Sequence, residues 1–293
     1  MNRTGVRVSS PTELVNPRTA DIDVVPTVEL VQLLHEQDAL VPAAVAQVLP
    51  VLARLVDDAA ARVQAGGRVH YFGAGTSGRL GVLDAAELLP TFGIDDDVVV
   101  AHQAGGAIAF LRAVEDAEDG GADAESLAAG DVVIGLAASG RTPYVGAALA
   151  AGRAVGAVTA LVTANPKAPL ADLADHLLVA PTGPEALAGS TRLKAGTAQK
   201  MILNMFSSAL MIRLGHTYRN LLVDMRATNA KLRGRSIELL IQATGRDENE
   251  CARALDECGE LKTALVHLLT GRSPSACRAA IEATGGVRKA LEA

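Results

Sequence analysis

Residues 69–93 read VHYFGAGTSGRLGVLDAAELLPTFG, and their order indicates how the central part of the chain folds. A short apolar run at 69–73 leads into a glycine-rich turn, and a segment with helical spacing follows. Gly73 to Gly78 fit the pattern G-x-G-x-x-G, which holds a dinucleotide when it follows a strand and opens a helix. The stretch therefore predicts a strand, a loop and a helix, with an anion bound at the loop.

A dinucleotide site also needs an acidic residue at the end of the second strand, about 20 positions after the glycines. The aspartates at 95–97 have nearly that spacing, but they precede the next apolar run at 98–102 instead of ending it. They would lie at the wrong edge of the sheet to reach a ribose. Thr76 and Ser77, by contrast, place hydroxyl groups beside a helix N-terminus, where backbone N–H groups and the helix dipole favour an anion.

Five short runs, near-continuously apolar and rich in Val, alternate with helical segments: 69–73, 98–102, 131–139, 157–163 and 176–180. Such runs are typical of strands buried on both faces, in a parallel sheet with helices on each side. The sequence therefore predicts an α/β protein with a doubly wound five-stranded parallel sheet. Ligands of such sheets bind at the carboxyl ends of the strands.

A second loop with hydroxyl groups follows the third apolar run. Residues 138–143 read ASGRTP, with Ser139 and Thr142 as the hydroxyl-bearing residues. Thr142 fits a helix N-cap and Pro143 fits the first helical turn. Taken alone, this loop is better interpreted as the start of an ordinary capped helix.

A third stretch, residues 189–200, reads GSTRLKAGTAQK and opens another helix. Ser190 and Thr191 can cap that helix, and Lys194 brings positive charge near its start. A solvated helix start is the alternative. Together the three stretches predict one small ligand that binds between them. They suit a sugar phosphate better than a dinucleotide.

One candidate acid follows the first loop by about three helical turns. Glu87 lies in the segment LDAAELLP, with Asp84 on the same helical face. The apolar neighbours Leu83, Leu88 and Leu89 are expected to raise the pKa of the Glu87 carboxyl, as a general acid requires. The alternative is a surface Glu at a helix end.

A second acidic group lies at 115–119, which reads EDAED. Glu115 and Glu118 are predicted to share one helical face, and Asp116 and Asp119 to share the next. A solvated acidic face accounts for most of these residues, and the pattern does not choose among them.

The two ends of the chain differ from its centre. Residues 1–26 are a polar arm, and helical spacing follows up to residue 65. Near the other end, residues 254–265 match 280–291 in residue class, which predicts two short helical units in tandem. The expected domains are 1–65, with the arm and N-terminal helices; 66–235, with the sheet; and 236–293, a small C-terminal helical domain.

Composition excludes several classes of protein. The net charge of -6 and the 2% of aromatic residues argue against a nucleic-acid partner. The N-terminus lacks the apolar core of a signal peptide, and no long apolar run predicts a membrane span. The three Cys are an odd count without metal-type spacing, which fits reduced thiols in a cytosolic protein.

Long ordered motifs connect the chain to a known family. GAGTSGRLGVLDAAELLPTFG, AGGAIAFLRAVEDAED, AASGRTPYVGAAL and GPEALAGSTRLKAGTAQKMILNM resemble the N-acetylmuramic acid 6-phosphate etherase family, as do TELVNPRTADID and LLVDMRATNAKLRGRS. The resemblance runs from about residue 12 to 236, and the C-terminal helical units also resemble the tail of that family.

This resemblance implies a sugar isomerase (SIS) fold and a bacterial cytoplasmic enzyme of cell-wall sugar recycling. The implied reaction cleaves the lactyl ether of N-acetylmuramic acid 6-phosphate, in a homodimer that uses no metal and no organic cofactor. Glu87 matches the family's catalytic acid, and Glu118 matches its second active-site Glu, with Glu115 as the rival position. The expected phosphate and sugar ligands are Thr76, Ser77, Ser139, Thr142, Ser190 and Lys194.

One motif departs from the family pattern. The family commonly reads D-A-S-E-C-P-P-T where this chain reads DAAELLPT at 84–91, so apolar residues replace a Ser, a Cys and a Pro. Two other functions stay open: a sugar-phosphate isomerase of the same fold, and a non-catalytic sugar-phosphate sensor similar to the glucokinase regulatory protein.

Overall fold

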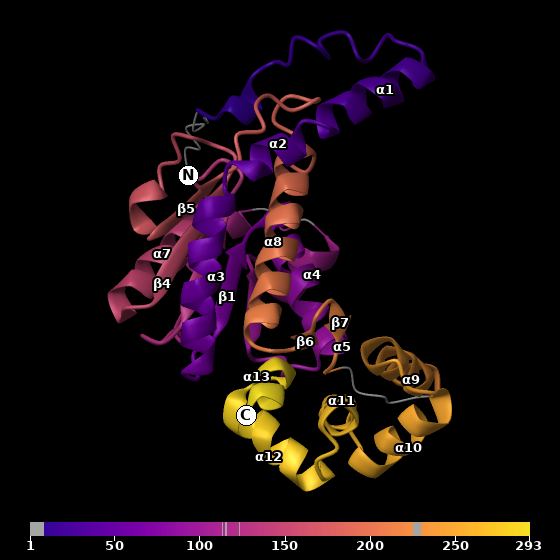
Figure 1. The fold of residues 1–293 in the computed structure, drawn as a ribbon. Helices are drawn as coiled ribbons and strands as arrows, with labels where there is room; N and C mark the ends of the chain where they lie inside the picture. Colours follow the sequence, from indigo (N-terminus) through magenta and orange to yellow (C-terminus); the bar gives the residue numbers. More distant parts are fainter. Residues whose placement is uncertain (1–8, 113, 115, 123, 225–229) are drawn as a thin grey trace. The chain divides into compact units, whose positions relative to one another are not determined.

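The computed structural model of the chain describes residues 9–112, 114, 116–122, 124–224 and 230–293 (Figure 1). By its packing the chain forms two compact units. The first contains the residues up to Ala85 together with Asp97–Phe206, and the second contains Ala86–Asp96 together with Ser207–Ala293. Helix α9 (Ala230–Thr244) runs through the domain limit expected at residue 235, and the three-domain division stays a prediction.

The first unit contains the sheet that the apolar runs predict. Its strands are β1 (Val69–Gly73), β2 (Val99–Gln103), β3 (Val132–Leu136), β4 (Val158–Thr163) and β5 (His176–Val179). All neighbouring strands pair in parallel, in the order β2-β1-β3-β4-β5. The chain winds one way from β1 to β2 and the other way from β3 to β5, so the topological switch point lies between β1 and β3. The predicted doubly wound fold is confirmed.

Helices α4 (Gly75–Ala86) and α8 (Lys194–Arg213) pack against one face of this sheet. Tyr71 of β1 meets Phe206 of α8 edge to face, with ring centroids 6.2 Å apart. Helix α4 approaches closely because it carries Gly81, where an added Cβ would lie 3.2 Å from the Tyr71 Cβ. Small residues on α4 therefore set its distance from the strands.

Helix α7 (Pro143–Val155) covers the opposite face of the sheet. Gly135 of β3 leaves room for it, because a Cβ there would lie 2.5 Å from Val145 and 3.3 Å from Leu149. Phe72, Val145 and Leu149 belong to the same buried apolar cluster. The alternation of β-strand side chains thus gives each face its own helix layer.

The predicted helical region before the sheet consists of α1 (Thr27–Asp38), α2 (Val41–Ala46) and α3 (Leu49–Gln64). The arm is held within the first unit, since Thr19 Oγ1 donates to the Ala186 carbonyl at 2.8 Å. Among the described residues no single helix is long and apolar enough to cross a bilayer, and only the bent pair Thr27–Ala46 with Leu49–Gln64 reaches that length and composition.

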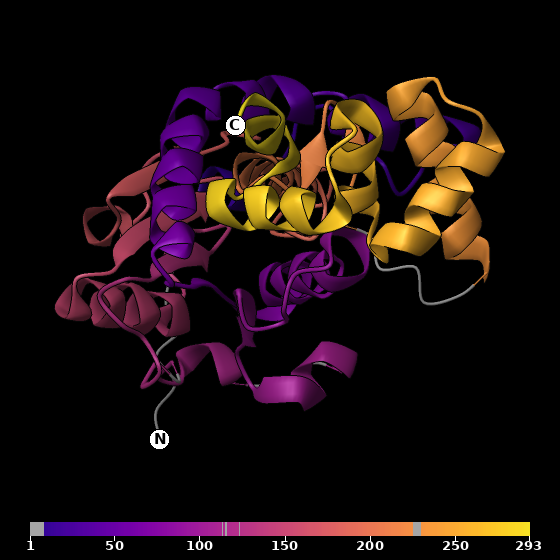
Figure 2. The ribbon, with the colours of Figure 1, turned by 60° about the horizontal axis from the view of Figure 1, so that its bottom comes forward.

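The second unit is mainly helical (Figure 2). Its elements include α5 (Leu88–Phe92), α9, α10 (Glu248–Cys258), α11 (Leu261–Thr270), α12 (Pro274–Thr284) and α13 (Val287–Glu292). A short hairpin of β6 (Thr217–Tyr218) and β7 (Leu221–Leu222), which the sequence did not predict, joins this unit. All three Cys are buried free thiols.

The tandem units predicted near the C-terminus are present as two helix pairs, α10 with α11 and α12 with α13. Gly259 and Gly285 end the first helix of each pair, with φ of 76° at both. This left-handed conformation is easy for Gly and difficult for other residues, which explains the matching glycines in the repeat.

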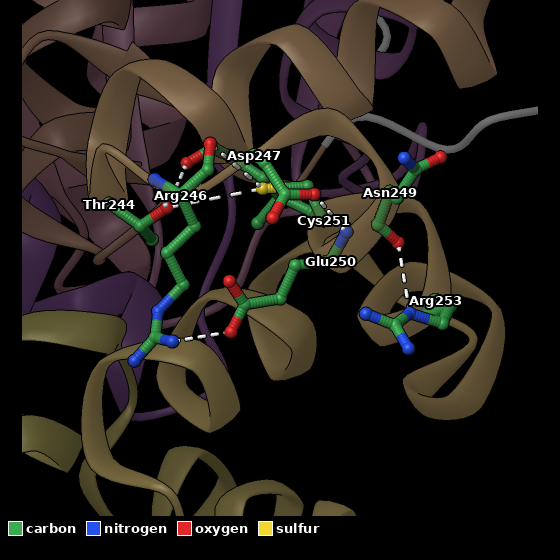
Figure 3. Close-up of polar contacts among 8 residues, drawn as sticks. Thr244, Arg246, Asp247, Asn249, Glu250, Cys251 and Arg253 are labelled. Atoms are coloured by element: carbon green, nitrogen blue, oxygen red, sulfur yellow. Dashed lines mark hydrogen bonds and ion pairs between the residues drawn. The ribbon is translucent and has the colours of Figure 1, made fainter.

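The start of α10 shows how local sequence fixes a helix boundary (Figure 3). Asp247 is the N-cap, and its carboxylate accepts the Glu250 N–H at 2.9 Å. Arg246 forms an ion pair with Glu250 across the same turn. Cys251 lies buried behind this cap, and burial raises the pKa of its thiol.

Candidate functional site

The first two predicted loops leave neighbouring strand ends. Gly73 at the end of β1 is in register with Leu136 at the end of β3. The loop after β1 and the loop after β3 therefore flank the topological switch point, where doubly wound sheets bind their ligands. Both loops therefore lie at the carboxyl ends of the strands, where the sequence predicts the ligand.

The second loop presents its hydroxyl groups without using them as caps. Thr142 occupies the N-cap position of α7, with Pro143 next, but the Thr142 side chain makes no capping hydrogen bond. The Ser139 carbonyl accepts a 2.9 Å hydrogen bond from Nδ2 of Asn165, the residue that follows β4 closely. Ser139 and Thr142 are both half-buried.

The third stretch lies against the first loop. A Cβ added at Gly196 would lie 3.6 Å from Cγ2 of Thr76, so the start of α8 passes close to the first turn of α4. Ser77 Oγ donates a 2.8 Å hydrogen bond to Oε1 of Gln199 on α8. The structure therefore brings residues from all three predicted stretches to the region beyond β1 and β3.

The cap of α8 differs from the prediction. The backbone N–H groups of Lys194 and Ala195 donate to the two carboxylate oxygens of Glu185, each at 2.9 Å. Glu185 therefore caps this helix in place of Ser190 or Thr191, because its carboxylate satisfies two N–H groups at once. Burial raises the pKa of Glu185, although these hydrogen bonds and Lys194 act in the opposite direction.

Lys194 is less exposed than a surface phosphate ligand would be. Its side chain is 2% exposed, and Nζ donates to Oε1 of Gln37 on α1 at 2.9 Å. The same Gln37 oxygen accepts a 2.7 Å hydrogen bond from Asn16 of the arm. Burial lowers the pKa of Lys194, while Glu185 raises it. Lys194 thus joins α8 to the N-terminal elements.

The glycines of the first loop allow an unusually close turn. A Cβ at Gly78 would lie 2.5 Å from the Gly73 carbonyl oxygen and 2.2 Å from Oε1 of Gln103. Gly75 has φ of 54°, in the left-handed region. These close approaches explain the glycines at 73 and 78 by packing, without any dinucleotide.

The aspartates at 95–97 lie before β2, as expected. Asp97 pairs with Arg68, which directly precedes β1, at 3.1 Å. This contact is at the amino ends of the strands, and the glycine loop is at the carboxyl ends. The structure therefore agrees with the argument against a ribose ligand.

Glu87 directly follows α4 and is exposed. Asp84, predicted on the same helical face, is instead 4% exposed and accepts a 3.1 Å hydrogen bond from Oη of Tyr71. Burial, followed by the charge of Asp84, raises the pKa of Tyr71 well above its ordinary value. Leu83 and Leu89 are also exposed, so the expected apolar enclosure of the Glu87 carboxylate is not formed by these leucines.

Glu118 lies on a single 3₁₀ turn, η2 (Ala117–Asp119), and is exposed. The predicted helical face through 115–119 is wrong, because Asp116 has φ of 61° and interrupts any helix. Glu115 lies outside the described residues. Helix α6 (Gly106–Leu111) ends before this acidic segment.

A pocket of about 780 Å³ lies at the carboxyl end of β2. His102 and Gln103 contribute from β2, Phe110 from α6, Tyr144 from α7, and Gly121 from the segment after η2. This volume is in the range of small-molecule sites. The pocket adjoins the first loop through Gln103, the second through Tyr144, and the segment of Glu118 through Gly121.

Gln199, Glu185 and Asn165 are not among the residues that the sequence predicts for this region. The sequence does indicate Gln199, because it follows Gly196 by three positions and so lies on the same helical face, which approaches the first loop. Glu185 and Asn165 act on backbone groups distant in sequence, and no local pattern marks them.

Comparison with known proteins agrees with this architecture. The family described as "SIS domain" matches residues 109–209, and the family described as "Glucokinase regulatory protein N-terminal SIS domain" matches residues 51–153. Both matched ranges include strands of the parallel sheet.

Three relatives match most of the chain, and each is named N-acetylmuramic acid 6-phosphate etherase. The relative from Thermobifida fusca is 56% identical over 90% of this chain and 88% of its own. The relative from Symbiobacterium thermophilum is 54% identical over 86% of each chain. The relative from Pectobacterium atrosepticum is 49% identical over 95% of each chain. The chain therefore belongs to the N-acetylmuramic acid 6-phosphate etherase family.

Proposed function

We propose that this protein is a carbon–oxygen lyase that cleaves the D-lactyl ether of N-acetylmuramic acid 6-phosphate. The products are N-acetylglucosamine 6-phosphate and D-lactate, and the reaction serves the recycling of cell-wall sugars. The observation that carries this proposal is the convergence of three hydroxyl-bearing stretches at the switch point of the sheet, in a chain whose relatives bear the etherase name. The proposed location is the cytoplasm, in line with the free thiols.

The phosphate and the sugar are held by hydroxyl groups of the three stretches. The proposed ligands are Thr76 and Ser77 on α4, Ser139 and Thr142 before α7, and Ser190 before α8. Lys194 contributes positive charge from behind the start of α8. Binding the remote phosphate orients the reacting carbons, so that this binding energy serves the chemical step.

The chemistry starts from the open-chain aldehyde, whose carbonyl acidifies the proton on C2. Glu118 removes this proton, the electron pair forms the C2–C3 double bond, and the C3–oxygen bond breaks. Glu87 protonates the departing oxygen, which leaves as the hydroxyl of D-lactate. Water then adds at C3, with Glu87 taking a proton from it, and Glu118 returns a proton to C2. Each proton transfer contributes about 10²–10⁴-fold.

A homodimer is the proposed working form, because one chain leaves apolar side chains uncovered. Val28 and Val31 on α1 are 78% and 56% exposed, and Leu111 at the end of α6 is 84% exposed. Uncovered apolar side chains on neighbouring turns favour association.

The proposed homodimer allows a site shared between two copies. In such a site, Glu87 of one copy acts on the sugar phosphate held by the hydroxyl groups of the other.

A non-catalytic sugar-phosphate sensor is the second candidate, favoured by the match to the glucokinase regulatory protein domain. Release of D-lactate separates the two functions, and it also excludes a simple isomerase. Turnover in H₂¹⁸O and in D₂O tests the mechanism. The elimination and addition steps predict one ¹⁸O at C3 and one deuterium at C2 of the sugar. Incorporation of ¹⁸O into lactate instead of the sugar would contradict them.

A further inference from the structure

The hydrogen bond between Ser77 and Gln199 has a direction that matters for binding an anion. Ser77 Oγ donates to Gln199 Oε1 at 2.8 Å. Gln199 is 3% exposed, and its Nε2 is buried without a hydrogen-bond partner among the described residues. A buried donor without a partner is costly, and it calls for an explanation.

A phosphate ester accepts hydrogen bonds and donates none when it is fully ionised. A serine hydroxyl has one proton, so Ser77 cannot donate to Gln199 and to a phosphate at the same time. In the arrangement above, the proton of Ser77 is used inside the protein. Binding a phosphate through Ser77 therefore requires the hydrogen bond with Gln199 to reverse.

We propose that Gln199 is a positioning residue that sets the direction of the Ser77 hydroxyl. A half-turn of the Gln199 carboxamide exchanges Oε1 and Nε2. Nε2 then donates to Ser77 Oγ, and the Ser77 proton turns to the phosphate of the sugar. This inference rests on the proposed function in taking a sugar 6-phosphate as the ligand and Ser77 as one of its partners.

The two orientations of the carboxamide differ little in their internal hydrogen bonds. In the first, Nε2 is the buried atom without a partner, and in the second Oε1 takes that place. An anion that accepts the Ser77 proton binds only the second orientation and so shifts the population toward it. The unpartnered Nε2 is thus explained as the group that donates to Ser77 Oγ when the phosphate is bound.

Two further contacts hold Gln199 in place for this role. Glu185 fixes the start of α8 by capping it, and Gly196 lets that helix lie close to Thr76, since an added Cβ would lie 3.6 Å from Thr76 Cγ2. Since Gly196 and Gln199 are three positions apart, one helical face approaches both Thr76 and Ser77. The backbone is fixed while the terminal amide can still turn.

Replacement of Gln199 by Glu and by Met tests the proposal. A carboxylate only accepts hydrogen bonds, so in Gln199→Glu the Ser77 hydroxyl keeps donating to residue 199. The methionine sulfur is a weak acceptor, so in Gln199→Met the Ser77 hydroxyl can donate to the phosphate. Calorimetry with N-acetylglucosamine 6-phosphate at pH 8 should show binding weakened about tenfold or more by Gln199→Glu, and only about threefold by Gln199→Met. Equal losses in the two variants, with thermal unfolding unchanged, would overturn the proposal.

A pH series separates the hydroxyl from simple charge repulsion. Protonation lets the introduced carboxyl donate to Ser77, so the loss in Gln199→Glu should shrink relative to wild type as the pH falls from 8 to 5.5. The double variant Ser77→Ala, Gln199→Glu should lose this recovery. If the double variant recovers as fully as the single one, repulsion explains the effect and the proposal fails.

Two further measurements cover misfolding of Gln199→Glu and failure of the proposed function. If Gln199→Glu does not fold, the cycle of Ser77→Ala with Gln199→Met applies: coupling of the two losses supports the proposal and strict additivity contradicts it. Lactate release by the wild type is measured in parallel. Absence of lactate overturns the proposed function, while the binding data still decide the role of Gln199.

Discussion

The Glu185 carboxylate accepts the backbone N–H of Ala195 at 2.9 Å and so caps α8, the helix that passes close to the first loop, residues 73–78. Its other oxygen accepts the N–H of Lys194 at the same distance. These N–H groups are therefore already satisfied by the protein. The proposed phosphate site therefore depends mainly on the hydroxyl groups of α4 and of the loop before α7.

Glu185→Ala should destabilise the first unit. The change leaves two N–H groups without partners and removes the carboxylate near the buried Lys194, so unfolding free energy should fall by about 3 kcal/mol. Denaturant unfolding measures the loss. Glu125→Ala is the control because Glu125 is exposed, and this variant should differ from wild type by less than about 0.5 kcal/mol. A loss no larger than that of the control would contradict the capping role.

Gly78→Ala should disturb the first loop more than Gly81→Ala. A Cβ at Gly78 meets the Gly73 carbonyl oxygen at 2.5 Å, while one at Gly81 meets only side chains, at 3.2 Å. The backbone cannot yield as a side chain can, so Gly78→Ala should cost about 2 kcal/mol or more and weaken sugar-phosphate binding. Thermal unfolding and calorimetry check both effects. Equal behaviour of the two variants would exclude a special role for the turn.

His70 should make the protein less stable in mild acid. Burial lowers the pKa of His70, and Arg68 adds to this, although Asp131 acts in the opposite direction. Below the unfolded pKa of about 6.5, the unfolded chain binds a proton at His70 and the folded protein does not. The free energy of unfolding therefore decreases as the pH is lowered, with a slope approaching about 1.4 kcal/mol per pH unit. Denaturant unfolding between pH 7.5 and 5.5 measures this slope.

The slope should be shallower in His70→Phe, which keeps a ring beside His102, and unchanged in His35→Gln, because His35 is exposed. A slope that is the same in wild type and His70→Phe would show that other groups control the acid response.

Mixing two inactive variants tests whether the site is shared between copies. Glu87→Ala lacks the proposed acid, and Ser77→Ala with Ser139→Ala should weaken the proposed phosphate site. If Glu87 acts on the substrate of its partner, a hybrid dimer has one intact site, and co-refolded mixtures should recover up to about a quarter of the wild-type activity. Recovery of no activity, with hybrids demonstrated by mass spectrometry, would place Glu87 and the loop in the same subunit.

The apolar runs predicted the sheet well because both faces of a parallel sheet are buried. Each predicted run coincides with a strand to within a few residues, and the loops after 69–73 and 131–139 meet at the switch point. The hairpin β6–β7 was missed, since four residues in two strands leave almost no periodic pattern.

Prediction of the site was less complete, because side chains far apart in sequence complete it. The hydroxyl residues of the first two loops are predicted from their place after strands, and their role as ligands stays a prediction. The cap of α8 was assigned to the nearest hydroxyls, although a carboxylate from residue 185 forms it. The left-handed conformation of Asp116 could not be predicted from the sequence of 115–119, because a single residue of this conformation leaves no periodic pattern.

The most direct test of the central claim is D-lactate release from N-acetylmuramic acid 6-phosphate by the wild type and by Glu87→Gln. Glu87 is exposed, so the substitution should leave thermal unfolding unchanged while it lowers kcat by about 10²–10⁴-fold. Lactate from the wild type, with this loss in the variant, is the predicted result. A folded wild type that binds the sugar phosphate and releases no lactate would contradict the lyase assignment.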